Sequence, residues 1–232
     1  MRQFRCRFTV CGLAVLMFLA VAWASVPAGD AAIDAGDYRA AVDAYKAAYE
    51  ANRAIEALYK LARAQVYLAE VSEGETAEQL YEEAVTHARQ ATEMAPELAE
   101  AHFEVARAVG RLAQFQGVLE ALNLAAEVEE ALSVTLELNP NHGGAYHALA
   151  MWHLEVPWIA GGRRAQVKPL FEKALSAEPG VIAHRVGYAE ALLRLEESDL
   201  AREQLEAALA MTPATVRDEA DLAEAQELLS GL

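Results

Sequence analysis

Apolar and small residues recur along the chain at the spacing of amphipathic α-helices, and the same two arrangements return several times. One places them at positions i, i+3 and i+4: Leu58/Leu61/Ala62 and Tyr146/Leu149/Ala150. The other has a small, a large and a small residue at i, i+4 and i+7: Ala41/Tyr45/Ala48, Val167/Phe171/Ala174 and Ala201/Leu205/Ala208. Each set lies on one face of a helix, with small residues where two helices cross closely. We therefore predict a series of paired helices.

Prolines follow these pairs at intervals along the chain. Pro96, Pro140, Pro179 and Pro213 lie 44, 39 and 34 residues apart. A proline stops a helix because it lacks an amide hydrogen and clashes with the preceding turn. A period of 34 residues is typical of arrays of helical hairpins, so the two longer intervals indicate insertions within individual units.

The composition agrees with an all-α chain. Alanine, the strongest helix former, supplies 51 of the 232 residues, whereas aromatic residues make up 7%. The apolar fraction of 54% argues against intrinsic disorder. Lysine and arginine number 19 against 35 acids, a net charge of −16. We expect no nucleic-acid partner, because phosphate contacts require basic patches.

The first 24 residues have the pattern of an export signal. Arg2, Arg5 and Arg7 precede a stretch that is most apolar at 13–21, and Ala22-Trp23-Ala24 fits a signal-peptidase site. We expect residues 1–24 to be a cleaved signal peptide and the protein to be periplasmic or secreted. The alternative is an uncleaved membrane anchor, because the uncharged run from Phe8 to Gly29 is long enough to span a bilayer. A membrane contact is expected only in that case.

The sequence contains no catalytic or cofactor-binding motif that we could identify. Cys6 and Cys11 lie within the predicted signal peptide, so the mature chain would have no thiol for catalysis, a disulfide or a metal. His142, His147 and His153 are 5 and 6 residues apart, which scatters them around a helix. We therefore predict no catalytic residue, no cofactor and no metal site, and we expect a non-enzymatic protein.

The hairpin pattern and its terminal prolines resemble the tetratricopeptide repeat (TPR) superfamily over about Ile33–Pro213. The resemblance implies an all-α, right-handed TPR-type solenoid of helical hairpins, with about four to five helix pairs over residues 25–213. We expect residues 214–232 to form a C-terminal capping helix. Its part from Asp218 to Leu229 is amphipathic, and the ends of a solenoid need a polar cover.

Two stretches resemble narrower families. Glu100-Ala101-His102-Phe103 and Gly144-Ala145-Tyr146-His147 are similar to the regulator-of-microtubule-dynamics group and its bacterial relatives. A weaker resemblance is to the periplasmic T component of TRAP transporters, which is also helical and TPR-like. This second resemblance implies an alternative function, an accessory subunit of a solute transporter that binds an apolar small ligand and forms a homo-oligomer.

The concave surface of a TPR array is lined by the first helix of each pair, and it is the candidate binding site. At one level this surface is expected to present Tyr59, Phe103 and His147, and one turn further on Arg63, Arg107 and Met151, with Arg111 beyond them. Arginine next to aromatic rings suits a carboxylate, or an acidic or aromatic peptide. We therefore predict a scaffold that binds a peptide or protein partner. The alternative is that Arg63 and Arg107 pair with neighbouring glutamates across helices.

The insertions are expected near residues 71–77, within a helical stretch at 114–130, and at 155–162. The last contains Pro157, which breaks a helix, followed by the apolar pair Trp158-Ile159 at a loop tip. We expect this pair to be tucked under its own repeat. In the alternative, Trp158 is offered to a partner, and for that reason it belongs to the candidate binding residues.

Overall fold

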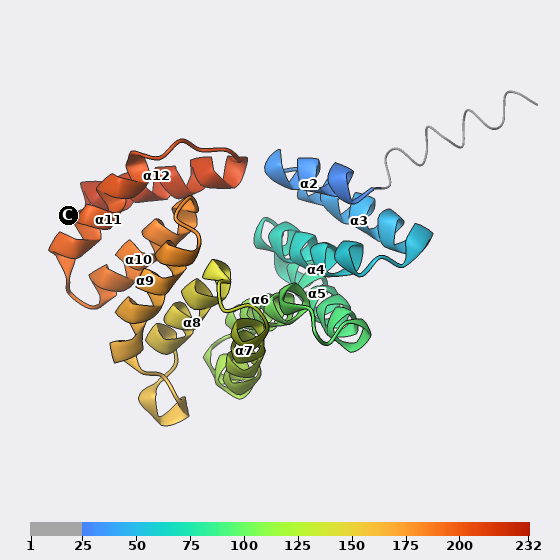
Figure 1. Cartoon of the computed structure of the whole chain (residues 1–232), viewed down its shortest axis with the longest axis horizontal. Coiled ribbons are helices and arrows are strands. Elements are labelled where there is room, and N and C mark those ends of the chain that lie inside the picture. The colour runs from blue at the N-terminus through green and yellow to red at the C-terminus, as the bar shows by residue number, and fades with distance from the viewer. Residues whose placement is uncertain (1–24) are drawn as a thin grey trace, which may run out of the picture.

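The structure is a computed structural model that describes residues 25–232, in which helices are joined by short loops and no strand occurs (Figure 1). The helices are α2 (Val26–Asp34), α3 (Tyr38–Asn52), α4 (Ile55–Glu70), α5 (Gly74–Met94), α6 (Ala99–Gln116), α7 (Val118–Leu138), α8 (Gly143–Glu155), α9 (Val167–Ala177), α10 (Ile182–Arg194), α11 (Ser198–Leu209) and α12 (Val216–Ser230). Two 3-10 turns, η1 (Trp158–Ala160) and η2 (Arg164–Gln166), lie between α8 and α9. The predicted signal peptide lies outside the described residues.

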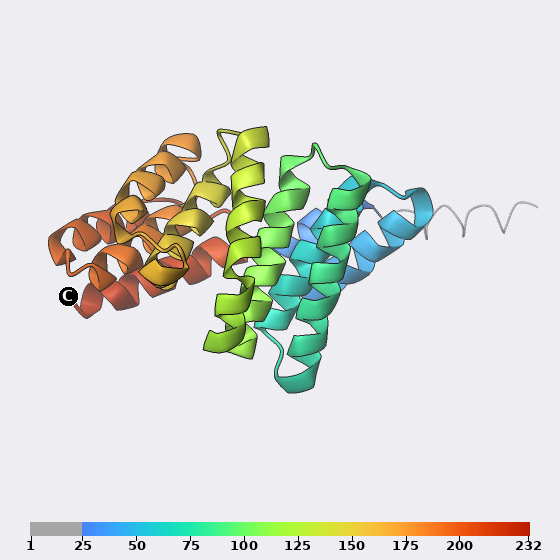
Figure 2. The ribbon, with the colours of Figure 1, turned by 90° about the horizontal axis from the view of Figure 1, so that it is seen from below.

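Consecutive helices pack as five pairs, from α2/α3 to α10/α11, and α12 follows the last pair. First helices of successive pairs also touch one another, as α4 touches α6, α8 touches α10 and α10 touches α12. Because helices on the inside of a curved array approach most closely, these first helices are the inner helices. Figures 1 and 2 show the pairs side by side along a curved array. The predicted all-α TPR-type solenoid is confirmed. None of the helices between residues 25 and 232 has the length and apolar character needed to cross a membrane.

The repeated prolines mark the ends of second helices. Pro96, Pro140 and Pro179 each stand two residues after the end of α5, α7 or α9. The residue before each of them has left the helical conformation, with ψ values of 72°, 91° and 71°. A following proline imposes this change, because its ring clashes with a helical backbone at the preceding residue.

Alanines lie at the helix crossings, which explains their abundance in the sequence. Fully buried examples come from nearly every pair: Ala41, Ala57, Ala84, Ala108, Ala145, Ala174, Ala201 and Ala225. A methyl group fills the space between two helices that cross closely and adds little side-chain entropy cost. Larger apolar residues fill the space beside the crossings, among them Leu58, Leu132, Phe171 and Leu205.

The exposed loop after α8 corrects one expectation. Trp158 and Ile159 are 84% and 76% exposed, so the prediction that they are tucked under their own repeat is wrong. The ring of Trp152 already fills the space beneath the loop, and its Nε1 donates a hydrogen bond to the carbonyl oxygen of Ala125 at 2.8 Å. Gly161 closes over that ring, where an added Cβ would lie 3.0 Å from it. No room is left for a second tryptophan.

A glycine in α2 allows the first pair to pack, and a second glycine provides a matched control. A Cβ on Gly29 would overlap the ring of Tyr45 in α3, which is held by a 2.7 Å hydrogen bond from its hydroxyl to Asp30. We expect Gly29→Ala to lower the free energy of unfolding by about 1–3 kcal/mol through overpacking. The added Cβ of Gly110→Ala in α6 would meet only Val128, at 3.9 Å. We expect this substitution to raise the free energy of unfolding by about 0.5–1 kcal/mol.

Urea unfolding followed by circular dichroism measures both effects. A loss of equal size in the two variants would contradict the packing role of Gly29.

Candidate functional site

A buried carboxylate joins two inner helices on the concave side of the array. Glu104 of α6 is fully buried. Its Oε1 accepts a hydrogen bond from Nε of Arg63 in α4 at 2.7 Å and lies 2.6 Å from Nη2 of the same guanidinium as an ion pair. Its Oε2 accepts a hydrogen bond from Arg107 Nε at 2.9 Å. Burial opposes the charged form of Arg63, but the Glu104 carboxylate outweighs it, so the pKa of Arg63 is raised. The two guanidinium groups offset the cost of burying the carboxylate.

This arrangement corresponds to the alternative interpretation of the two arginines, in which they pair with a glutamate across helices. Arg107 also reaches beyond that pair. Its guanidinium lies 4.7 Å from the ring centre of Phe103 and 5.7 Å from that of Tyr67, and its Nη1 is 3.5 Å from the Tyr67 hydroxyl. Arg107 therefore connects the buried carboxylate with an aromatic side chain of α4.

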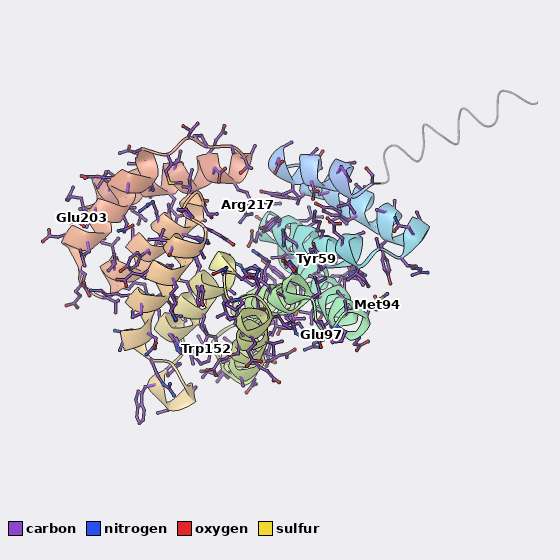
Figure 3. All side chains as sticks on the ribbon, viewed as in Figure 1. Tyr59, Met94, Glu97, Trp152, Glu203 and Arg217 are labelled. Carbon is purple, nitrogen blue, oxygen red and sulfur yellow. The ribbon has the colours of Figure 1, made fainter. Side chains whose placement is uncertain are left out.

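A second carboxylate links three helices. Glu70 at the end of α4 forms an ion pair with Arg111 of α6, whose Nε lies 3.1 Å from Oε1, and its Oε2 accepts a hydrogen bond from Nη1 of Arg217 in α12 at 3.2 Å. The guanidinium of Arg217 lies 3.9 Å from the ring centre of Tyr67. In Figure 3, Arg217 lies where the start of α12 approaches α4. Burial opposes its charge, but Tyr67 and Glu70 favour it, so the pKa of Arg217 is raised.

We call these connected side chains the inner arginine network: Arg63, Arg107, Arg111 and Arg217 with Tyr67, Glu70 and Glu104. It contains four cations and two carboxylates in a chain whose net charge is −16. Asp221 stands one turn after Arg217, and burial raises the pKa of its carboxyl. Each guanidinium has five N–H donors, and the contacts above use only some of them. The remaining donors are of the chemical type that binds carboxylates.

Aromatic residues of the predicted ladder pack the inner helices together. Phe103 is 7% exposed, and its ring lies 3.0 Å from where a Cβ on Gly144 of α8 would be. The ring of His147 lies 2.5 Å from the corresponding position on Gly187 of α10. Each ring thus rests on a glycine of the next inner helix. A side chain in place of Gly187 would clash with His147, and one in place of Gly144 would require the Phe103 ring to shift by a few tenths of an ångström. Tyr59 is half-buried, and burial raises the pKa of its hydroxyl.

His147 also begins a chain of hydrogen bonds that ends at a helix N-terminus. Its Nδ1 is 3.1 Å from Nδ1 of His184, whose Nε2 is 3.0 Å from a carboxylate oxygen of Glu178. The other oxygen of Glu178 accepts from the backbone N–H of Gly143 at 3.1 Å. Burial, together with the smaller effects of His184, Arg107 and Arg111, lowers the pKa of His147 to about 3, so the ring is neutral near pH 7. Among residues 25–232, no group of three or more His, Cys, Asp or Glu side chains could hold a metal ion.

The structure therefore brings together only part of the predicted site. Arg63, Arg107 and Arg111 belong to one network. Met151 packs against the C-terminal part of the core, and Trp158 lies on the exposed loop after α8. Sequence reasoning missed Arg217 and Tyr67. No local pattern identifies Arg217, because it meets Glu70 across 147 residues of sequence.

Comparisons with known proteins agree with a TPR-type helical fold. A thermophilic TPR protein from Thermus thermophilus, TTC0263, superimposes with a TM-score of 0.71 at 20% identity, covering 87% of this chain and 97% of that one. YrrB, described as a TPR protein with an unusual peptide-binding site, gives 0.47 at 16% identity, over 95% and 98% of the chains. MamA (41-end) from Desulfovibrio magneticus RS-1 gives 0.49 at 15%, over 86% and 96%.

The family model described as regulator of microtubule dynamics protein 1-3 matches residues 28–165. This chain belongs to that family, as the resemblance in the sequence indicated. A comparison with curated proteins finds no significant match.

Removing one partner of Glu104 should cost far more than breaking an exposed pair. We expect Arg63→Met to lower the free energy of unfolding by about 3 kcal/mol, because the buried carboxylate keeps only Arg107. Arg89→Met is the matched control: it breaks another Arg–Glu pair between helices, with Glu127, whose side chains are 51% and 34% exposed. Its expected cost is at most about 1 kcal/mol. Thermal unfolding measures both, and equal losses would show that Glu104 does not depend on Arg63.

A carboxyl group between α10 and α12 should make stability depend on pH. Burial and the neighbouring Glu224 are the main reasons why the pKa of Glu190 is raised from 4.5 to about 7. Arg194 opposes this rise, and Glu155 adds to it. The folded state then binds more protons than the unfolded state between these two values, so stability is lost as pH rises from about 4.5 to about 7. His147 acts in the opposite direction, since its lowered pKa makes stability rise with pH between about 3 and about 6.5.

We therefore expect the free energy of unfolding to fall less in Glu190→Gln than in the wild type as the pH rises from 5 to 7.5, because the substitution removes the titrating carboxyl. The contribution of His147 is common to both proteins. Glu203→Gln on the exposed face of α11 is the control. The comparison uses urea unfolding at each pH. Parallel pH profiles of the wild type and Glu190→Gln would contradict the assignment.

Proposed function

We propose that the protein is an exported, non-enzymatic scaffold that binds an acidic segment of a protein partner at the inner arginine network. The observation that carries the proposal is the gathering of four arginines on the inner face of a chain with a net charge of −16. Positive charge that exceeds the bonded carboxylates at one place attracts a negative ligand there. The acidic remainder of the surface repels the same ligand, which favours this face.

The exposure of the arginines suggests how they divide their roles. Arg63 and Arg107 are 30% and 24% exposed and hold the buried Glu104, so they fix the geometry of the network. Arg111 and Arg217 are 49% and 37% exposed and share Glu70. These two present guanidinium groups to a ligand carboxylate, which can bind them through paired, charge-assisted hydrogen bonds. The export part of the proposal is supported only by the sequence pattern of residues 1–24.

A model peptide tests the binding function without knowledge of the partner. The probe is a fluorescein-labelled peptide of six glutamates and one tyrosine, compared with the same peptide containing glutamines, and binding is followed by fluorescence anisotropy. We expect the glutamate peptide to bind and the glutamine peptide to bind much more weakly. Arg111→Gln should weaken binding about tenfold, because it removes a charged hydrogen-bond donor.

The matched control is Arg89→Gln, which should leave the affinity unchanged. Arg89 is also an exposed arginine, and it pairs with Glu127 of α7, the second helix of its pair. Circular dichroism must show equal helix content in all variants. The proposal is wrong if the two variants bind the glutamate peptide equally, or if the glutamine peptide binds as tightly as the glutamate peptide.

A further inference from the structure

Exposed apolar side chains gather at two turns of the array. Six of the twelve large apolar residues that are exposed between residues 25 and 232 lie there. We call these two turns the apolar tips: the turn between α6 and α7 with Phe115, Val118, Leu119 and Leu122, and the turn η1 with Trp158 and Ile159. Leu119 is 81% exposed and Trp158 is 84% exposed. A concentration of this kind marks a surface that contacts another molecule or a membrane.

The two tips lie next to each other at one edge of the array. The chain reverses its direction inside each pair and again between pairs, so the turns inside the pairs share an edge; Figure 2 shows those of α4/α5 and α6/α7 at its lower side. The loop after α8 lies against α7, because Trp152 binds the carbonyl oxygen of Ala125 and a Cβ on Gly161 would lie 3.9 Å from Glu129. Val118 stands two helical turns before Ala125, which is about 10 Å along the helix.

Packing of the array does not account for these side chains. No residue of α7 before Ala125 is buried. Helices α6 and α7 have 18 and 21 residues, whereas α8 and α9 have 13 and 11, so the tip of the longer pair extends past the shorter one. The loop after α8 projects beyond the helices in Figure 1, and Trp152 fills the space beneath it. Both tips therefore expose apolar side chains that the fold does not use.

The charge at the tips differs from that of the whole chain. Residues 156–171 carry three basic residues and no acidic one, although the net charge of the chain is −16. Arg163 and Arg164 of this stretch are exposed, and neither forms a salt bridge in the described part of the chain. In the first tip, residues 112–126 carry a single charge, that of Glu120. The edge thus combines apolar side chains with a local excess of positive charge.

We infer that the apolar tips insert into the surface of a bilayer that contains anionic lipids, with Arg163 and Arg164 next to the lipid phosphate groups. Tryptophan is favoured at the boundary between headgroups and acyl chains, because its ring is apolar and its N–H is polar. Basic residues beside such a tip attract anionic lipids at short range. Side chains that project singly from turns enter a fluid bilayer without a matching pocket. The contact is independent of the inner arginine network and needs no anchor in residues 1–24.

A fluorescent probe at each tip tests this contact in the full chain. Nitrobenzoxadiazole is attached to Ile159→Cys or Leu119→Cys, with Cys6→Ser and Cys11→Ser, and vesicles of phosphatidylcholine and phosphatidylglycerol in equal amounts are added. The emission of this probe rises when it leaves water for the acyl region, and we expect a rise of about twofold or more at both positions. Val181→Cys, in the turn between α9 and α10 at the other edge, is the control and should show no rise. Because the probe reports only its own surroundings, binding of another part of the chain to the vesicles does not produce the signal.

The role of the two loop arginines is tested on the chain labelled at position 159. We expect Arg163→Gln with Arg164→Gln to raise the lipid concentration needed for half of the emission change about tenfold, because each arginine near an anionic surface adds attraction. Arg39→Gln with Arg202→Gln is the matched control. It removes the same charge from exposed arginines of the first and last pairs and should cause little change. Equal effects of the two double substitutions would overturn the contact of the loop arginines with lipid phosphate.

Three further results would contradict the inference. No rise at position 159, or an equal rise at position 181, would overturn insertion of the loop. A rise at position 159 without one at position 119 would overturn the shared surface of the two tips. A change that depends on protein concentration and needs no vesicles would assign the tips to a protein interface instead of a bilayer. All substituted side chains are exposed, and circular dichroism checks that the helix content is equal in every variant.

Discussion

The close approach of the inner helices is the constraint on which the rest of the structure depends. First helices touch one another across neighbouring pairs, and this is possible only where small residues meet. Gly144 lies under Phe103 and Gly187 lies under His147, each at a position with little or no room for a side chain. Tight contacts on the inner side make the array curl, and the curl brings α12 back to the first units.

The close approach of the inner helices α4 and α6 also brings charged groups into contact, and it explains the burial of the Glu104 carboxylate. Glu104 lies between α4 and α6 where water is excluded, and a lone carboxylate there would be costly. Arg63 comes from one helix and Arg107 from the other, so the pair of cations also fixes how the two helices are placed along one another. A well-packed apolar residue could stabilise this position as well. The charged arrangement is distinctive because it extends through Tyr67 and Glu70 to the end of the chain.

Features that follow local rules could be predicted from the sequence. Helix pairs follow from residue spacing, and their ends follow from the conformational effect of proline on the preceding residue. Arg63, Arg107 and Arg111 could be placed on one face because they are separated by whole helical turns or stand at equivalent positions in successive units. The identity of their partner could not be predicted, since Glu104 meets Arg63 only through the register of α6 on α4.

Two further features lay beyond sequence reasoning for different physical reasons. Trp158 is exposed because Trp152 already fills the space under the loop, and a pattern of apolar residues does not show which of two tryptophans will fill one site. Arg217 reaches Tyr67 because small rotations add up over the four helix pairs from α4/α5 to α10/α11, so this contact depends on every unit between them.

The contact between α12 and the first units of the array gives the C-terminal helix a second role besides covering the last helix pair. A polar cover at the end of a solenoid needs only an amphipathic helix packed on the last pair, and Leu222, Ala225 and Leu228 provide that contact. Arg217 adds something that a cover does not require, because it places a cation on the ring of Tyr67 and on the carboxylate of Glu70. The fourth arginine of the network thus comes from the opposite end of the chain, so the charge of the inner face depends on whether the array is closed.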